Sequence, residues 1–236
     1  MTLTWLEVFS VLVGPLLLGA MLLRWQGVVP RTDPLAYFGW AWLQGCLGLA
    51  LLLSAWLWLR WPLAATHIAP VLLGLSVFGF ALARRVRVLE PADAGRHPAW
   101  ERWVFALVLA LLLATTLDRI LLASADVLVS SDEARIWAAK ARVLFHTGGF
   151  GEGFLAAVRT PEIIAHPDYP PLNPLLQLWV HAHAGTLVHV ESRLPVQFYG
   201  LAGILVAASA LRRRARPLVA ALFLVCIATI GRFFTY

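Results

Sequence analysis

The chain has 236 residues, of which 60% are hydrophobic and only 14% are charged. A soluble domain has about 45–50% apolar and about 25% charged residues. With a mean hydropathy of +0.76, this composition excludes a soluble globule, a disordered tail and a nucleic-acid-binding domain. It predicts an all-α polytopic membrane protein.

The net charge of +6 does not indicate a nucleic-acid partner, because of where the positive residues lie. Nearly all of them are arginines in short segments between apolar runs, which is typical of topology signals and lipid-phosphate contacts. The amino terminus has no basic region and carries Glu7, so it predicts a first membrane helix rather than a cleaved signal peptide.

Membrane-spanning helices need about 20 mainly apolar residues. About six stretches meet or approach this length, one of them shorter than the rest. They cover about residues 5–23, 37–59, 63–82, 103–124, 195–211 and 217–235. The stretch 172–185 is apolar over about a dozen residues, which favours an amphipathic helix lying on the outer surface.

Orientation follows from the arginines near the helix ends. Placing the links near residues 24–31, 84–102 and 212–216 on the cytoplasmic side collects eleven of the nineteen positive charges there. The amino terminus and a long loop at about 125–193 then lie outside. The composition, rich in arginine, alanine and leucine, favours a bacterial inner membrane.

Most of the polar chemistry falls in that outer loop. Eight of the thirteen acidic residues, five of the seven histidines and the only lysine lie between Asp118 and Glu191. A polar concentration of this kind indicates either a working surface or simply an exposed loop. Within it, Asp132 and Glu133 precede a helical pattern over 133–146. Ser130 with Glu133 also fits a capping box, so a purely structural role stays open.

A second feature is the run from His166 to Pro174, with four prolines in eight residues. Proline fixes the backbone and cannot continue a preceding helix, so the run predicts a rigid turn that launches the helix at 172–185. A simple transition from loop to helix accounts for it equally well.

Taken in order, these features resemble the GT-C glycosyltransferases. The match consists of a membrane helix, an outer loop opening with Asp-Glu, a Tyr-Pro-Pro-Leu turn, a short apolar helix and an Arg-Leu-Pro entry into a helix ending in arginines. It is nearest to the branch with protein O-mannosyltransferases and the aminoarabinose transferases that modify lipid A. The resemblance covers about residues 103–235. It implies two parts, a three-helix membrane extension (1–100) and the first portion of a catalytic module (101–236).

The resemblance implies transfer of a sugar from a polyprenyl-phosphate carrier to an acceptor outside the membrane. Asp132 would be the general base, and Glu133 would orient the acceptor or cap the helix. The leaving phosphate needs cations, and the substrate-binding candidates of this kind are Arg135, Lys140, Arg142 and Arg232. His166, Asp168 and Tyr169 would support the turn or contact the acceptor.

Cofactor and partner predictions are less defined. Asp132, Glu133, His166 and Asp168 are suitable ligand types for a divalent metal, but no tight ligand spacing appears, so the sequence leaves a divalent metal open and defines no cofactor. Family members carry the Asp-Glu loop after their first helix and continue for many more helices. The chain is therefore expected to be the N-terminal part of a transferase: a truncated piece, a split gene product whose missing helices a second chain supplies, or a degenerate copy. The alternatives are a non-catalytic membrane subunit or scaffold, and a transporter, which the apolar mid-span positions disfavour.

Overall fold

A computed structural model describes residues 3–89, 97–123, 133–164, 166 and 168–229. Within these residues every regular element is a helix, as the composition predicts. The elements are α1 (Trp5–Trp25), α2 (Pro34–Trp58), α3 (Ala65–Ala83), α4 (Ala99–Ala123), the π-helix η1 (Glu133–Trp137), α5 (Ala138–Thr147), α6 (Glu152–Val158), α7 (Leu172–Ala184), the 3-10 helix η2 (Glu191–Arg193), α8 (Leu194–Arg214) and α9 (Pro217–Thr229).

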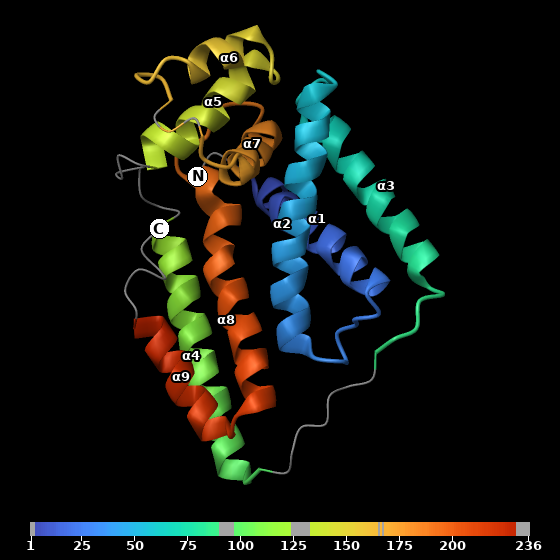
Figure 1. Cartoon of the computed structure of the whole chain (residues 1–236), viewed down its shortest axis with the longest axis vertical. Helices are drawn as coiled ribbons and strands as arrows, with labels where there is room; N and C mark the ends of the chain where they lie inside the picture. The colour runs from blue at the N-terminus through green and yellow to red at the C-terminus, as the bar shows by residue number, and fades with distance from the viewer. Residues whose placement is uncertain (1–2, 90–96, 124–132, 165, 167, 230–236) are drawn as a thin grey trace.

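Five helices are long and apolar enough to cross a membrane, namely α1, α2, α3, α4 and α8 with η2. Figure 1 shows α2, α4, α8 and α9 running roughly along the long axis; α1 packs against α2, and α3 packs against α1. The predicted sixth stretch, 217–235, is described only as far as Thr229, where α9 has 13 residues. The described chain therefore supports an integral membrane protein with five candidate spans.

Local signals explain where the first helices begin. Thr4 and Glu7 form a capping box at the start of α1, in which each side chain bonds the other residue's backbone N–H. Asp33 accepts a hydrogen bond from the N–H of Ala36, with Pro34 as the first residue of α2. Both starts are readable in the sequence.

The first two helices pack with their backbones in close approach. A Cβ on Gly19 would lie 1.7 Å from the carbonyl oxygen of Ala41, and a Cβ on Gly45 would lie 1.8 Å from that of Pro15. Small residues allow such approach between apolar helices, where hydrophobic burial provides little driving force. Since α1 also packs against α3, the first three helices form one group.

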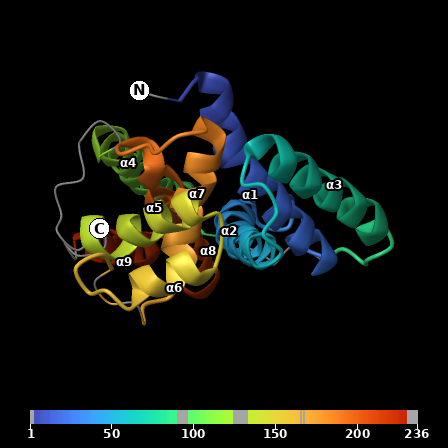
Figure 2. The same ribbon diagram turned by 90° about the horizontal axis from the view of Figure 1, so that it is seen from above.

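A second group consists of α4, α8 and α9, whose core contains Phe105, Leu109, Ile204 and Leu224. The two groups meet along α2 and α8, where Gly39 leaves room for Ala202 and Val206. Figure 2 shows the groups side by side, with α7 between them. The division into parts at about residue 100 stays a prediction, because α2 and α8 share an extensive interface.

At one end of the long axis, α5, α6 and α7 lie across the helix ends, and we call these helices with the segment 159–171 the cap (Figure 1). The helix expected at 172–185 is present as α7, but every residue from Pro174 to Ala182 is buried. Surface-lying is therefore the wrong description for α7. It is buried because α5 covers one side while α1, α2 and α8 pack on the others.

Candidate functional site

The candidate site lies where α5 begins in the cap. The chain enters α5 through the π-helix η1, which starts at Glu133. Single π-turns are rare and occur frequently at functional sites. Asp132 lies outside the described residues, and only the backbone is described for Glu133 and Arg135. The structure therefore places the end of the Asp-Glu motif next to the π-helix and leaves the two carboxylates undescribed.

Lys140 joins α5 to the proline-rich turn, which is 29 residues away in sequence. Its Nζ donates a hydrogen bond to the carbonyl oxygen of Tyr169, at 2.9 Å. The Lys140 side chain is only 3% exposed. A buried lysine is costly unless its charge is compensated, so this contact is a specific feature of the fold.

Aromatic rings surround the same contact. The centre of the Trp137 ring lies 5.6 Å from the centre of the Tyr169 ring. The His166 ring stacks on the same Tyr169 ring, with 4.9 Å between their centres. The Nζ of Lys140 lies 5.8 Å from the centre of the Trp137 ring, within reach of a cation–π interaction. Three of the predicted substrate-binding residues, Lys140, His166 and Tyr169, are thus brought together, and Trp137 joins them.

The electrostatics of the cluster are set mainly by Lys140. Burial lowers the pKa of its ammonium, while the charge of Asp168 opposes this effect. Asp168 itself is exposed. The cluster therefore holds a partly desolvated cation beside aromatic rings, with the charge of Asp168 acting on it.

Arg142 makes contacts within its own segment, and its predicted contact with a phosphate stays a prediction. Its Nε donates to the carbonyl oxygen of Ala138 at 3.3 Å, and its Nη2 donates to that of Ala134 at 3.0 Å. The guanidinium therefore bridges η1 and α5. A π-helix leaves carbonyl oxygens in need of donors where it joins an α-helix, and Arg142 supplies them.

The turn itself holds an unusual backbone. His166 has φ of 55°, in the left-handed region that residues other than glycine seldom adopt. Its carbonyl oxygen accepts a hydrogen bond from the N–H of Tyr169 at 3.3 Å. The tight turn holds the His166 ring against Tyr169, which agrees with the rigid turn predicted from the prolines.

Two histidines of α7 make contacts inside the protein. The Nδ1 of His181 accepts a hydrogen bond from the N–H of Val188 at 3.2 Å, and burial lowers the pKa of His181 to about 4. His183 Nε2 lies 2.9 Å from the Oγ of Ser10 on α1, and its Nδ1 lies 2.9 Å from the carbonyl oxygen of Trp179. These histidines tie α7 to its neighbours.

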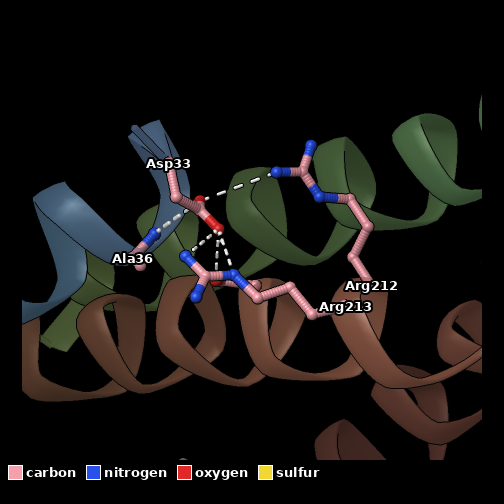
Figure 3. Close-up of polar contacts among 5 residues, drawn as sticks. Asp33, Ala36, Arg212 and Arg213 are labelled. Atoms are coloured by element: carbon pink, nitrogen blue, oxygen red, sulfur yellow. Dashed lines mark hydrogen bonds and ion pairs between the residues drawn. The ribbon is translucent and has the colours of Figure 1, made fainter. Parts of the chain in front are cut away.

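A polar network that sequence reasoning missed lies at the opposite end of the molecule, between α2 and α8 (Figure 3). Asp33 is 2% exposed. Its Oδ2 accepts hydrogen bonds from Ser209 Oγ at 2.7 Å and from Arg213 Nε and Nη2 at 3.0 and 2.9 Å. Arg212 Nη2 lies 3.6 Å from Oδ1. Two features of the sequence could have indicated this network. Asp33 comes directly before an apolar helix, and the arginine run 212–216 lies in a link assigned to the same side of the membrane.

Burial alone would raise the pKa of Asp33, but the hydrogen bonds from Ser209, the Ala36 N–H and Arg213 lower it below its ordinary value. The carboxylate is therefore charged at neutral pH. A similar pair forms nearby, where buried Glu101 of α4 accepts from Arg216 in the link between α8 and α9. Both carboxylates anchor the arginine run 212–216.

Two further predictions are a divalent metal and a substrate-binding role for Arg232. Among the residues that the structure describes, no group of three or more histidine, cysteine or acidic side chains is placed to hold a metal ion. The metal prediction involved Asp132 and Glu133, so it stays untested. Arg232 lies outside the described residues.

No protein-family model, curated protein or solved structure matches the chain. The resemblance to the GT-C glycosyltransferases therefore stays a prediction based on the order and spacing of the sequence motifs.

Proposed function

We propose that the chain is a membrane glycosyltransferase, or the first part of one, that moves a sugar from a polyprenyl-phosphate carrier to an acceptor at the outer face of a membrane. The observation that supports this most is the hydrogen bond from Lys140 to Tyr169. It joins the helix that follows the Asp-Glu motif to the Tyr-Pro-Pro-Leu turn. The helix after the first motif and the turn of the second motif are thus in contact, which is what the proposal rests on.

The proposed reaction is a displacement at the anomeric carbon. The acceptor hydroxyl oxygen bonds to that carbon while the bond from the carbon to the phosphate oxygen breaks, and the phosphate leaves with the electron pair. Asp132 takes the hydroxyl proton as general base. Lys140, and Arg135 if it faces the cluster, stabilise the negative charge that grows on the departing polyprenyl phosphate.

The proposed location of this chemistry is the outer side of a bacterial inner membrane. The described helices alternate in direction, so the cap lies at one end and the link segments rich in arginine lie at the other (Figure 1). Arginine near helix ends favours the cytoplasmic side. This orientation puts the cap, the amino terminus and the candidate site outside.

The direct test is sugar transfer from a labelled polyprenyl-phosphate sugar pool in membranes that contain the chain. Asp132→Asn is expected to reduce transfer at least about 100-fold, because general-base catalysis contributes 10²–10⁴-fold. Glu162→Gln, which removes an exposed carboxylate in the same outer segment, is the matched control and is expected to leave transfer unchanged. A parallel sample contains the neighbouring reading frame, which tests whether a second chain supplies further helices.

The second candidate is a non-catalytic membrane subunit or scaffold. It is favoured by the hydrogen bonds of Lys140 and Arg142, since these contacts also hold the cap together without any reaction. Absence of transfer in both samples, with inserted and folded protein, would support this candidate over the enzyme.

A further inference from the structure

The second polar region of the molecule, at the end opposite the cap, has no role in the proposed reaction. Here α1, α3 and α8 end and α2, α4 and α9 begin, at the lower ends of the ribbons in Figure 1. We call it the arginine end. Its exposed charged side chains in the described chain are all arginines, namely Arg31, Arg84, Arg85, Arg87, Arg102, Arg212, Arg213, Arg214 and Arg216.

The described carboxylates of this end are not exposed, so they do not neutralise the positive charge at the surface. Asp33 and Glu101 are both buried, beneath the arginine run 212–216 with which they pair. The run carries four positive charges against these two, so it keeps a surplus of two. Among the described residues of this end, the two carboxylates are thus used internally and arginines face the outside.

The arginines separate into two classes. Arg213 and Arg216 are held by carboxylates, and the guanidinium of Arg24 donates to the carbonyl oxygens of Val86 and Arg84. A second class has no side-chain partner within the described chain, and consists of Arg31, Arg84, Arg85, Arg87, Arg102 and Arg214. The first class stabilises the fold, while the second is available to an external anion.

The distribution of the second class indicates the shape of the partner. These arginines are spread over the ends of several helices rather than gathered in one pocket, which suits a flat layer of anions better than a compact ligand. Exposed tryptophans accompany them, with Trp25 at the end of α1 and Trp100 and Trp103 at the start of α4. Tryptophan is enriched at the level of lipid headgroups, so this end lies at a membrane surface.

We propose that the arginine end binds anionic phospholipid headgroups through the arginines that have no side-chain partner among the described residues, and that it selects anionic over zwitterionic lipid. This does not depend on whether the cap transfers sugar. Each such arginine near an anionic surface adds about fivefold to association. The preference for anionic lipid applies to the headgroups around the ends of the candidate spans, and it holds this end of the chain in the headgroup layer of one leaflet.

The test compares spin-labelled phosphatidylglycerol with spin-labelled phosphatidylcholine at the boundary of the full chain in phosphatidylcholine vesicles. The relative association constant of the two lipids, from electron paramagnetic resonance, is expected to favour phosphatidylglycerol by at least about fivefold. It is expected to fall in 0.5 M salt, because salt screens exposed charges. A quadruple variant with Arg84→Gln, Arg85→Gln, Arg87→Gln and Arg214→Gln keeps Arg31 and Arg102, and is expected to lower the ratio at least about fivefold.

Two further variants make the result specific. The corresponding quadruple Lys variant keeps the charges and is expected to keep the preference. The control with Arg60→Gln and Arg159→Gln removes exposed arginines on the cap side and is expected to leave the ratio unchanged. No preference in the wild type, a preference that is unchanged in the Gln variant, or an equal loss in the control would overturn the proposal, as would tight binding of an RNA oligonucleotide with no lipid preference.

Discussion

The two polar ends of the molecule handle buried charge in opposite ways. In the cap, the Lys140 ammonium is buried beside an aromatic ring, donates a hydrogen bond to a carbonyl oxygen and is influenced by the charge of a carboxylate. At the arginine end, the carboxylate Asp33 is buried and is fully engaged by two arginines, a serine and a backbone N–H. The difference indicates that the Asp33 network holds α2 to α8, whereas the contact of Lys140 joins α5 to the proline-rich turn of the cap.

The largest expected effect on stability is at the arginine end. Asp33→Ala removes the acceptor of Ser209 and Arg213 and the cap of α2, and is expected to lower the free energy of unfolding by about 3 kcal/mol. Thermal unfolding in detergent micelles measures this. Asp33→Asn keeps the acceptor for the Ala36 N–H and is expected to lose less. If Asp33→Ala unfolds like the wild type, the network does not hold α2 to α8.

In the cap, Lys140→Met is expected to affect sugar transfer strongly and thermal stability little, the opposite of Asp33→Ala. An apolar side chain of similar length fits a buried position without the cost of desolvating a charge, so thermal stability is expected to stay close to that of the wild type. Sugar transfer is expected to fall about 100-fold, because the charge that meets the leaving phosphate is gone. Loss of stability with unchanged transfer would show that Lys140 is only structural, and the contrast between the two ends would disappear.

Acidification is expected to weaken the cap before it affects the arginine end. Because burial lowers the pKa of His181 from 6.5 to about 4, the unfolded state binds a proton more readily than the folded state does. The stability contributed by neutral His181 is thus complete above pH 6.5 and is lost as the pH falls towards 4, by about 3 kcal/mol. His189, Arg142 and His146 add positive charge around it and act in the same direction.

The check is the midpoint of thermal unfolding between pH 7.5 and 4.5 for the wild type and for His181→Asn. Asparagine can accept the bond from the N–H of Val188 but does not titrate, so the variant is expected to lack this part of the pH dependence. An identical pH profile for both proteins would assign the loss to other groups.

The smallest expected effect separates two neighbouring arginines. Arg214 has no partner in the described chain, so Arg214→Gln is expected to change stability by less than about 0.5 kcal/mol in zwitterionic lipid. Arg213→Gln leaves the buried carboxylate with one guanidinium and is expected to lower stability by about 1 kcal/mol, reduced because the Arg213 side chain is 44% exposed. Equal effects of the two substitutions in thermal unfolding would contradict the division of the arginines into two classes.

Local patterns in the sequence predict much of the fold. Apolar runs predict the candidate spans, and prolines predict the turn beside Tyr169, because both act within a few residues. The burial of α7 was not predictable in this way, since it depends on α5 covering it, and an apolar run of that length looks the same on a membrane surface. The Asp33 network likewise joins residues about 176 to 180 positions apart.

The candidate site was only partly predictable for the same reason. Lys140 and Tyr169 were both named from the sequence, but that they touch depends on how the segment between them folds back. Trp137 gives no signal in the sequence apart from its apolar character. The contact of Arg142 with a carbonyl oxygen of the π-helix was also not predictable, because the sequence does not reveal that helix.

The central claim is that the cap, rather than the arginine end, receives a polyprenyl phosphate. The most direct measurement is labelling of the full chain in vesicles with a photoreactive polyprenyl phosphate, followed by peptide mapping. The claim predicts label on peptides between residues 133 and 171 that decreases in Lys140→Met and is unaffected by excess phosphatidylglycerol. Label confined to peptides of the arginine end and displaced by phosphatidylglycerol would contradict it.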